Sequence, residues 1–201
     1  MSSMAARLVS ELTERGETLS FCESLTAGLA SATVASVPGA SAVLRGGLVT
    51  YATEVKSHFL HQPVADIEAV GVVSGQTALA MARAAVAETG ADWGIGLTGV
   101  AGPDLQEGKA AGTVYIGIYS PSGVSFSQQL SGLGKERNEV REATVEAALR
   151  LLRATLEENP ALGNNNETRS VDYSDEHFYC SPRTPGKRRC CTSGARHCSY
   201  P

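Results

Sequence analysis

Apolar and polar residues alternate along this chain with two different periods, and the change of period marks the predicted elements. Apolar residues recur every three or four positions in three segments, which predicts amphipathic helices over 5–15, 74–88 and 135–158. Short apolar runs bounded by glycine, proline or polar residues predict strands over 18–22, 47–51, 93–98, 113–119 and 124–130. Helices that alternate with strands are typical of a layered α/β domain.

Two further helices and a tight turn complete the predicted pattern. Residues 25–37 are apolar on nearly every side, which predicts a buried helix that ends at Pro38-Gly39. Residues 54–60 are predicted to form a short helix. Pro121-Ser122-Gly123 joins the last two strands in the manner of a hairpin. Because a hairpin pairs its strands antiparallel, the central sheet is predicted to be mixed.

Length and composition limit the class of protein. The chain has 201 residues, enough for one domain with a core, and its net charge of −4 argues against broad nucleic-acid binding, which needs a basic face. No run approaches the roughly 18 apolar residues of a membrane span, and the N-terminus lacks the unbroken apolar stretch of a signal peptide. Cys22 is the one cysteine before residue 160, which suits a reducing cytosol and predicts a cytoplasmic protein.

The composition changes after Pro160, which predicts one domain over 1–160 and a separate tail over 161–201. The tail is rich in Asn, Ser, Thr, Arg and Cys and poor in aliphatic residues, so it is predicted to be disordered. Its metal-binding side chains follow no standard zinc spacing, and an irrelevant or frameshifted tail is the simpler interpretation. These side chains are Cys180, Cys190, Cys191, His197 and Cys198.

Ser24 follows the first predicted strand, where the chain turns into a helix. A hydroxyl at such a turn stands at the carboxyl edge of a sheet, beside helix N–H groups that can hold an anion. Glu23 precedes it, and Thr26, Ala27 and Gly28 follow it. The plainer interpretation is that Ser24, with help from Thr26, only caps the helix that begins at Leu25.

Lys56 follows the second predicted strand, in Tyr51-Ala52-Thr53-Glu54-Val55-Lys56. If the first two strands are neighbours, their ends converge and Lys56 can approach Ser24. A partly desolvated lysine has a lowered pKa and can take the proton of a serine hydroxyl, and Tyr51 can relay or orient that proton. The plainer interpretation is a solvated lysine and an amphipathic tyrosine.

Anion-binding candidates come from a glycine-containing turn and from arginines. Thr98, Gly99 and Gly102 lie where the third predicted strand ends, and successive N–H groups there can form an anion nest, or the turn is merely tight. Arg137 and Arg141 are four residues apart and share a helix face, as phosphate partners or as members of surface ion pairs. Arg45 is a third candidate for the phosphate.

Several blocks, in order, resemble one known family over about residues 5–157. The blocks are Glu23-Ser24-Leu25-Thr26-Ala27-Gly28, Pro38-Gly39-Ala40-Ser41, Gly46-Gly47-Leu48-Val49-Thr50-Tyr51 with Lys56, Gly71-Val72-Val73-Ser74, Thr98-Gly99-Val100-Ala101-Gly102-Pro103 and Gly112-Thr113-Val114-Tyr115. On these motifs the chain is similar to the CinA C-terminal domain family, the nicotinamide-nucleotide amidohydrolases. The resemblance implies a three-layer α/β/α sandwich, and a homodimer in many members.

The resemblance also implies an activity: hydrolysis of the carboxamide of nicotinamide mononucleotide to nicotinate mononucleotide and ammonia, a step of pyridine nucleotide salvage. By carry-over, Ser24 is the expected nucleophile, Lys56 the base and Tyr51 an assistant, with neither metal nor cofactor. The expected partner is the small nucleotide substrate, and no binding to nucleic acid or to a membrane is expected. The predicted substrate-binding set is Glu23, Thr26, Ala27, Gly28, Ser41, Arg45, Thr98, Gly99, Gly102, Arg137 and Arg141.

The chain departs from the family signature at several positions. Leu25 stands where the signature has Cys, Ala27 where it has Gly, and Thr53 where Asn is usual. These departures support an alternative function, a nucleotide-binding or regulatory module of the same fold that has weak or no turnover. A third hypothesis is an amidase for another small amide.

Overall fold

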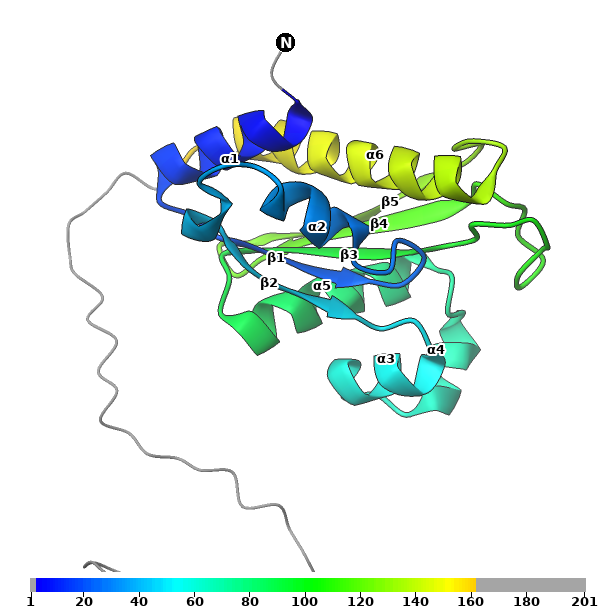
Figure 1. The fold of residues 1–201 in the computed structure, drawn as a ribbon. Coiled ribbons are helices and arrows are strands. Elements are labelled where there is room, and N and C mark those ends of the chain that lie inside the picture. Colours follow the sequence, from blue (N-terminus) through cyan, green and yellow to red (C-terminus); the bar gives the residue numbers. More distant parts are fainter. Residues whose placement is uncertain (1–2, 162–201) are drawn as a thin grey trace, which may run out of the picture. The chain divides into compact units, whose positions relative to one another are not determined.

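The computed structural model describes residues 3–161, which contain a five-stranded sheet with helices on both faces (Figure 1). The sheet order is β2-β1-β3-β4-β5. The strands are β1 (Leu19–Glu23), β2 (Leu44–Val49), β3 (Trp93–Gly99), β4 (Val114–Ser120) and β5 (Val124–Leu130). β1 pairs in parallel with β2 and β3, whereas β4 runs antiparallel to both β3 and β5. The predicted mixed sheet is therefore confirmed, and the first two strands are neighbours, which was the condition for Lys56 to approach Ser24.

Six α-helices and one 3₁₀ turn surround this sheet in the described part of the chain. They are α1 (Met4–Arg15), α2 (Leu29–Ala35), η1 (Ala40–Ala42), α3 (Thr53–Leu60), α4 (Val64–Val70), α5 (Gly75–Thr89) and α6 (Arg137–Glu158). Figure 1 shows α1, α2 and α6 above the sheet and α5, with α3 and α4, below it. The three-layer α/β/α architecture is confirmed.

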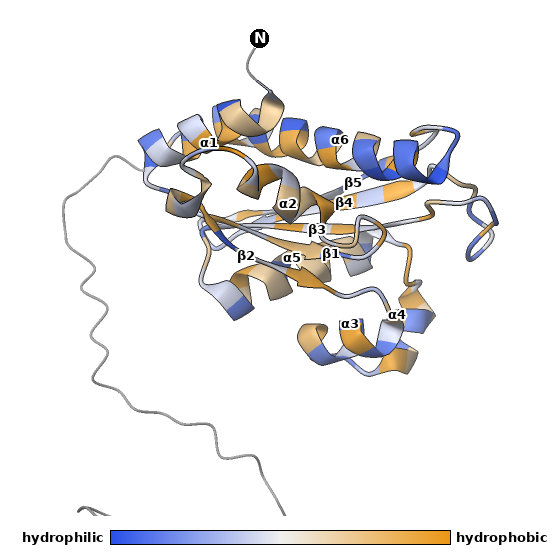
Figure 2. Ribbon diagram, in the orientation of Figure 1, coloured by the Kyte–Doolittle hydropathy of each residue, from blue (hydrophilic) through white to orange (hydrophobic). Residues whose placement is uncertain are grey.

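Two apolar clusters hold the layers together. The larger lies between the sheet and α1, α2 and α6, and it includes the α6 stripe of Val145, Leu149, Leu152 and Leu156. The smaller, on the other face, contains Cys22, Met81 and Ala85. Figure 2 shows the alternation of apolar and polar residues along α6 that this packing requires. Since burial of apolar area is the main favourable contribution to folding, these clusters hold the helices against the two faces of the sheet.

Close approach of α5 to the sheet depends on glycine. A Cβ atom at Gly96 of β3 or at Gly117 of β4 would collide with the backbone carbonyl of Ala78 in α5. The absence of side chains at these two positions lets the Ala-rich face of α5 lie directly on the strands. Ser74 is the N-cap of this helix, because its hydroxyl accepts a hydrogen bond from the Thr77 N–H group.

The helix predicted over 25–37 differs most from the observed one. α2 begins only at Leu29, because Ala27 (φ 50°) and Gly28 (φ 90°) adopt left-handed backbone conformations that a right-handed helix excludes. It is also half exposed, with Ala30 and Val34 as its buried residues. The sequence pattern missed α4, in which Ile67 is the single buried residue, so little periodicity marks it.

Two further sequence predictions concern a membrane span and the tail of the chain. No helix in residues 3–161 is both long enough and apolar enough to cross a membrane. The predicted disorder of the tail and its five metal-binding side chains concern residues 162–201, which lie outside the described range.

Candidate active site

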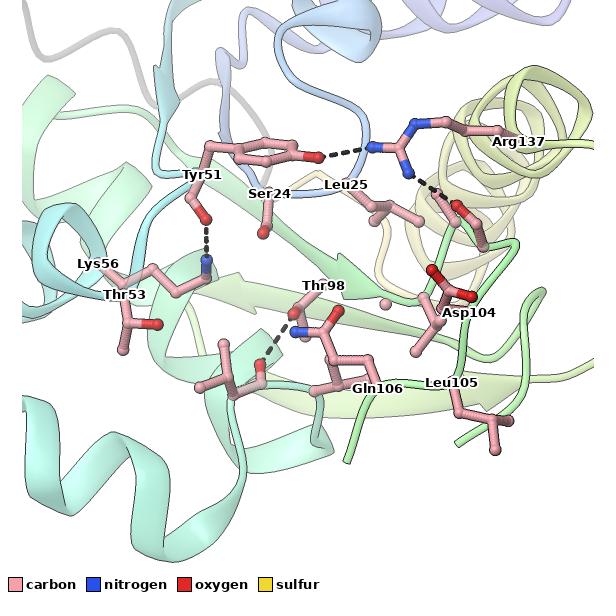
Figure 3. A pocket seen from close by; sticks show the side chains of 16 residues that line it. Ser24, Leu25, Tyr51, Thr53, Lys56, Thr98, Asp104, Leu105, Gln106 and Arg137 are labelled. Carbon is pink, nitrogen blue, oxygen red and sulfur yellow. Dashed lines mark hydrogen bonds between the residues drawn. The ribbon is translucent and has the colours of Figure 1, made fainter. Parts of the chain in front are cut away.

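A cavity of about 340 Å³ opens where the parallel strands end. Five separate segments line it (Figure 3), which come from the β1–α2 turn, the β2–α3 connection, the α4–α5 link, the loop after β3 and the start of α6. Ligands of open α/β sheets bind outside the carboxyl ends of the strands, because the loops diverge there. The lining residues are Ser24, Leu25, Tyr51, Thr53, Lys56, Val72, Val73, Thr98, Gly99, Val100, Ala101, Gly102, Asp104, Leu105, Gln106 and Arg137.

Ser24 is the first residue after β1, and its side chain faces the cavity (Figure 3). Its N–H group donates to the Leu97 carbonyl oxygen at 2.9 Å, which ties the turn to β3. The residue that caps α2 is Gly28, without a side-chain hydrogen bond. The capping interpretation of Ser24 and Thr26 is therefore wrong, and the Ser24 hydroxyl has no hydrogen-bond partner within residues 3–161.

Glu23 occupies the anion-binding position at the start of α2. Its buried carboxylate accepts hydrogen bonds from the N–H groups of Gly28, Ala30 and Ser31 at 2.8–3.1 Å, and from the Ser31 hydroxyl at 2.6 Å. A negative group at a helix N-terminus satisfies its unpaired N–H groups. Because the carboxylate of Glu23 already occupies this place, the start of α2 is not available to a substrate phosphate.

Replacing Glu23 by Gln is expected to lower the free energy of unfolding by about 2 kcal/mol, because a neutral amide leaves part of a buried, charge-assisted network unpaired. Urea denaturation followed by circular dichroism measures the change. Glu142→Gln, at an exposed position of α6, is the matched control and should change stability little. Equal stability of the two variants would contradict the capping role of Glu23.

Lys56 is the buried cation of the site, with 1% of its surface exposed. Its Nζ atom donates to the carbonyl oxygens of Thr50 at 2.7 Å and of Tyr51 at 3.0 Å. Burial lowers the pKa of this amine from 10.5 to about 8, an effect that the nearby Cys22 thiol slightly opposes. A neutral amine has two N–H bonds and one lone pair, so two carbonyl partners leave the lone pair free for a proton donor.

Ser24 and Lys56 line the same cavity from different elements, as predicted from the convergence of β1 and β2. Figure 3 shows the hydroxyl and the amine on the same side of the cavity. No hydrogen bond joins them in the part of the chain that the structure describes. Contacts between catalytic groups are often longer in a ligand-free site and tighten when substrate binds.

Cys22 is a buried residue of β1, two positions before Ser24. Burial raises the pKa of its thiol to about 11, although a hydrogen-bond contact with the Thr50 hydroxyl and the charge of Lys56 oppose the rise. Because the nucleophilic form of cysteine is the thiolate, a thiol that stays protonated is chemically quiet. The Cys22 thiol is therefore not expected to compete with Ser24 as a nucleophile.

Tyr51 and Arg137 meet above Ser24 (Figure 3). One guanidinium nitrogen of Arg137 donates to the Tyr51 hydroxyl at 2.6 Å, and another donates to the Gly102 carbonyl oxygen at 2.9 Å. Tyr51 contacts Lys56 through its backbone carbonyl, while its hydroxyl points to Arg137. The geometry thus offers no relay from the Tyr51 hydroxyl to Lys56, and it instead places an exposed aromatic ring (55% exposed) on the wall of the cavity that Ser24 also lines.

The loop after β3 closes the opposite wall. The Thr98 hydroxyl donates to the Val72 carbonyl oxygen at 2.8 Å, and Gly102 has a left-handed backbone (φ 84°). Glu107 holds this loop in place, since its carboxylate accepts from the N–H groups of Val72 and Val73 at 2.8 and 3.0 Å. The N–H groups of Ala101 and Gly102 have no acceptor within residues 3–161.

Seven of the residues predicted to bind substrate do not line the cavity: Glu23, Thr26, Ala27, Gly28, Ser41, Arg45 and Arg141. Arg45 lies near the start of β2, roughly 13 Å along the strand from its carboxyl end, and Ser41 precedes it. Ala27 is exposed, and the Thr26 hydroxyl is buried without a hydrogen-bond partner in the described part of the chain. Arg141 instead contacts the turn that carries Ser24, through the carbonyl oxygens of Leu25 and Thr26.

Other lining residues were missing from the predicted site. Val72 and Val73 line the cavity, although their sequence block, Gly71-Val72-Val73-Ser74, indicates only membership of the family and not a place in the site. Asp104, Leu105 and Gln106 follow the predicted turn directly, and their polar and apolar mixture carries no periodic signal. In residues 3–161 no group of three or more His, Cys, Asp and Glu side chains could hold a metal ion.

The fold and the cavity define a three-layer α/β/α domain with a serine and a buried lysine at the carboxyl ends of its parallel strands. Residues 1–156 match the model of the CinA C-terminal domain. The chain belongs to the CinA C-terminal domain family, and the resemblance found in the motifs is confirmed.

Relatives and solved structures agree with this membership. A Streptococcus pneumoniae protein named as competence-damage inducible is 46% identical over 155 residues, which are 77% of this chain and 37% of that protein. The chain therefore spans little more than a third of the length of the curated relatives that it matches. The crystal structure of competence/damage inducible protein CihA from Agrobacterium tumefaciens has a TM-score of 0.71 at 33% identity, over 75% of this chain and 92% of that one. A CinA superfamily protein from Klebsiella pneumoniae has a TM-score of 0.73 at 27% identity, over 77% of this chain and 96% of that one.

Proposed function

We propose that this domain hydrolyses the carboxamide of nicotinamide mononucleotide to nicotinate mononucleotide and ammonia. The observation that carries the proposal is Lys56, a buried amine whose pKa is lowered to about 8, on the same cavity as a serine hydroxyl that has no hydrogen-bond partner among the described residues. A lysine in this state is a base at neutral pH, and a serine hydroxyl needs such a base to become a nucleophile.

In the proposed first step, the neutral Lys56 amine takes the proton from the Ser24 hydroxyl. The hydroxyl oxygen then forms a bond to the carboxamide carbon, and the electron pair of the carbonyl moves onto its oxygen. The N–H group of Leu25, the residue after the nucleophile, and those of Ala101 and Gly102 are candidate donors to this oxyanion, because they have no acceptor within residues 3–161. Such donors are typically worth about 3 kcal/mol each in the transition state.

The second step expels ammonia. The Lys56 ammonium returns its proton to the amide nitrogen, the carbon–nitrogen bond breaks, and an acyl ester of Ser24 remains. Water then attacks the ester with Lys56 again as base, which releases the carboxylate product and restores the hydroxyl. Every proton that leaves Ser24 or water thus passes through one side chain.

Arg137 is the proposed phosphate ligand. It is the arginine that lines the cavity among the described residues, and its guanidinium stands at the exposed rim beside Tyr51. A planar fork of N–H groups suits a phosphate. The Tyr51 ring lies over Ser24, where it can stack on the pyridinium ring of the substrate, a cation that favours an aromatic face.

Ammonia release by the purified chain tests the proposal, with nicotinamide mononucleotide, nicotinamide riboside and free nicotinamide as substrates. Turnover that falls in this order supports the nucleotide as substrate. Equal turnover of the three amides would instead favour a general small-amide amidase. Release from none of them would refute the amidohydrolase proposal.

The rate kcat/KM is expected to rise about tenfold per pH unit below pH 8 and to level off above it, because the reactive form of Lys56 is the unprotonated amine. At pH 7 about a tenth of the molecules hold this form. A pH–rate profile from pH 6 to 9.5, at constant ionic strength, measures the midpoint. A rate that falls with rising pH through this range would exclude Lys56 as the base.

A second candidate function is a nucleotide-binding or regulatory module. The observation that favours it is the absence, in residues 3–161, of a hydrogen bond between Ser24 and Lys56, together with the two carbonyl partners of the Lys56 amine. Saturable binding of the nucleotide by calorimetry, without ammonia release, would support it. In either function we expect the protein to be a homodimer in the cytoplasm. Sedimentation velocity of the purified chain can test the dimer.

A further inference from the structure

Arg141 contacts the backbone that carries the nucleophile. Its Nε and Nη2 atoms donate to the carbonyl oxygens of Leu25 at 3.2 Å and of Thr26 at 2.9 Å, and its Nη1 atom donates to the Asn138 side chain at 3.0 Å. All three nitrogen atoms of the guanidinium are therefore engaged by the protein. Leu25 and Thr26 are the two residues that follow Ser24 directly.

Arg137 lies one helical turn earlier and has a different environment. It lines the cavity and is exposed, whereas Arg141 is partly buried and does not line the cavity. Four residues of α-helix span roughly 6 Å along the axis, which separates the cavity rim from the turn behind it. The two arginines therefore share a helix face but serve different groups.

The contacted turn needs external support. Ala27 holds a left-handed backbone (φ 50°), which is strained for a residue with a Cβ atom. Two hydrogen bonds already fix the turn: the Ser24 N–H group donates to the Leu97 carbonyl oxygen, and the Gly28 N–H group donates to the Glu23 carboxylate. Arg141 adds the hydrogen bonds to the Leu25 and Thr26 carbonyl oxygens. Because a peptide unit is planar, fixing the Leu25 carbonyl also fixes the direction of the Thr26 N–H group.

We propose that Arg141 is a positioning residue for Ser24: its guanidinium fork locks the Leu25 and Thr26 carbonyls and so holds the hydroxyl in line with the substrate carbonyl. This inference rests on the proposed amidohydrolase function, and it separates the two arginines into a phosphate ligand, Arg137, and a support of the nucleophile, Arg141.

The test measures kcat and KM separately for nicotinamide mononucleotide and nicotinamide riboside, which carry the same amide with and without the phosphate. Arg141→Gln is expected to lower kcat about 100-fold on both substrates, with little change in KM, because misplacing a reacting group by about 1 Å costs that much. Arg141→Lys keeps the charge but loses the fork, and should recover only part of kcat. Arg137→Gln should instead raise KM, more for the nucleotide than for the riboside.

Arg150→Gln is the matched control on the same helix, since Arg150 is exposed and pairs with Glu146. It should leave all four constants unchanged. A rise in KM for the nucleotide alone in Arg141→Gln would overturn the proposal and make Arg141 a phosphate ligand. Wild-type kcat on both substrates in that variant would overturn it as well.

Hydrogen exchange separates failure of this inference from failure of the proposed function, because it needs no turnover. The N–H groups of Ala27 and Gly28 donate to the Ser24 carbonyl oxygen and the Glu23 carboxylate, so they report how firmly the turn is held. In Arg141→Gln their exchange is expected to accelerate at least about tenfold, with exchange in β3 unchanged. If the wild-type chain released no ammonia, acceleration would still support the positioning role, and unchanged exchange would refute it.

Discussion

Ser24→Ala is expected to lower ammonia release from nicotinamide mononucleotide by about 10⁶-fold, the loss found on removing the nucleophile of a serine hydrolase. The change removes one oxygen atom that has no hydrogen-bond partner within residues 3–161, in a side chain that lines a cavity. Stability should therefore stay close to that of the wild type, within about 0.5 kcal/mol. A loss of activity without a loss of stability is the signature of a chemical role.

The measurement pairs a continuous ammonia assay with thermal unfolding of the same preparations. Ser36→Ala is the matched control, because Ser36 is an exposed serine at the end of α2 whose hydroxyl only bonds to the Thr33 carbonyl oxygen. It should keep full activity. Substantial turnover by Ser24→Ala would remove the acyl-ester mechanism, and the reaction would then require direct attack by water.

Lys56→Met is expected to lower kcat about 10³-fold, within the range that a general base contributes. Methionine has a similar length and no charge, so it fills the buried space without a proton acceptor. The combined variant Ser24→Ala with Lys56→Met should be scarcely slower than Ser24→Ala alone, since a base without its nucleophile has no proton to remove. Multiplicative losses in the combined variant would show that the two residues act independently.

The stability of Lys56→Met tests the buried charge itself. Folding lowers the pKa of Lys56 from 10.5 to about 8, so between these pH values the unfolded chain binds more protons than the folded one. The stability of the wild type relative to Lys56→Met should therefore rise from pH 8 to pH 10.5 and be lowest below pH 8. Urea unfolding of both proteins at pH 7, 8, 9 and 10 measures the difference. A difference that does not change with pH would mean that the lysine is not perturbed by burial.

The local pattern of the sequence predicted most of the fold because apolar spacing reflects which side of an element is buried. The α6 stripe and the strand β5 appear where the periodicity places them. The start of α2 does not, because the left-handed residues Ala27 and Gly28 and the Glu23 carboxylate decide where that helix begins. Side-chain contacts of this kind leave no trace in hydrophobic spacing.

By itself, the sequence determined the order of the strands and of the helices other than α4, the mixed sheet, the family, and the pair of residues whose chemistry is of interest, Ser24 and Lys56. The elements follow from local periodicity, and the family and the residue pair follow from short motifs that occur in a fixed order over about residues 5–157. The tertiary structure alone decided that Lys56 is buried with a lowered pKa, that Glu23 already occupies the helix end, and that Arg137 and Arg141 face different groups. The reason is physical: burial, desolvation and distances across a cavity depend on segments that are far apart in the chain and meet only when the sheet has formed.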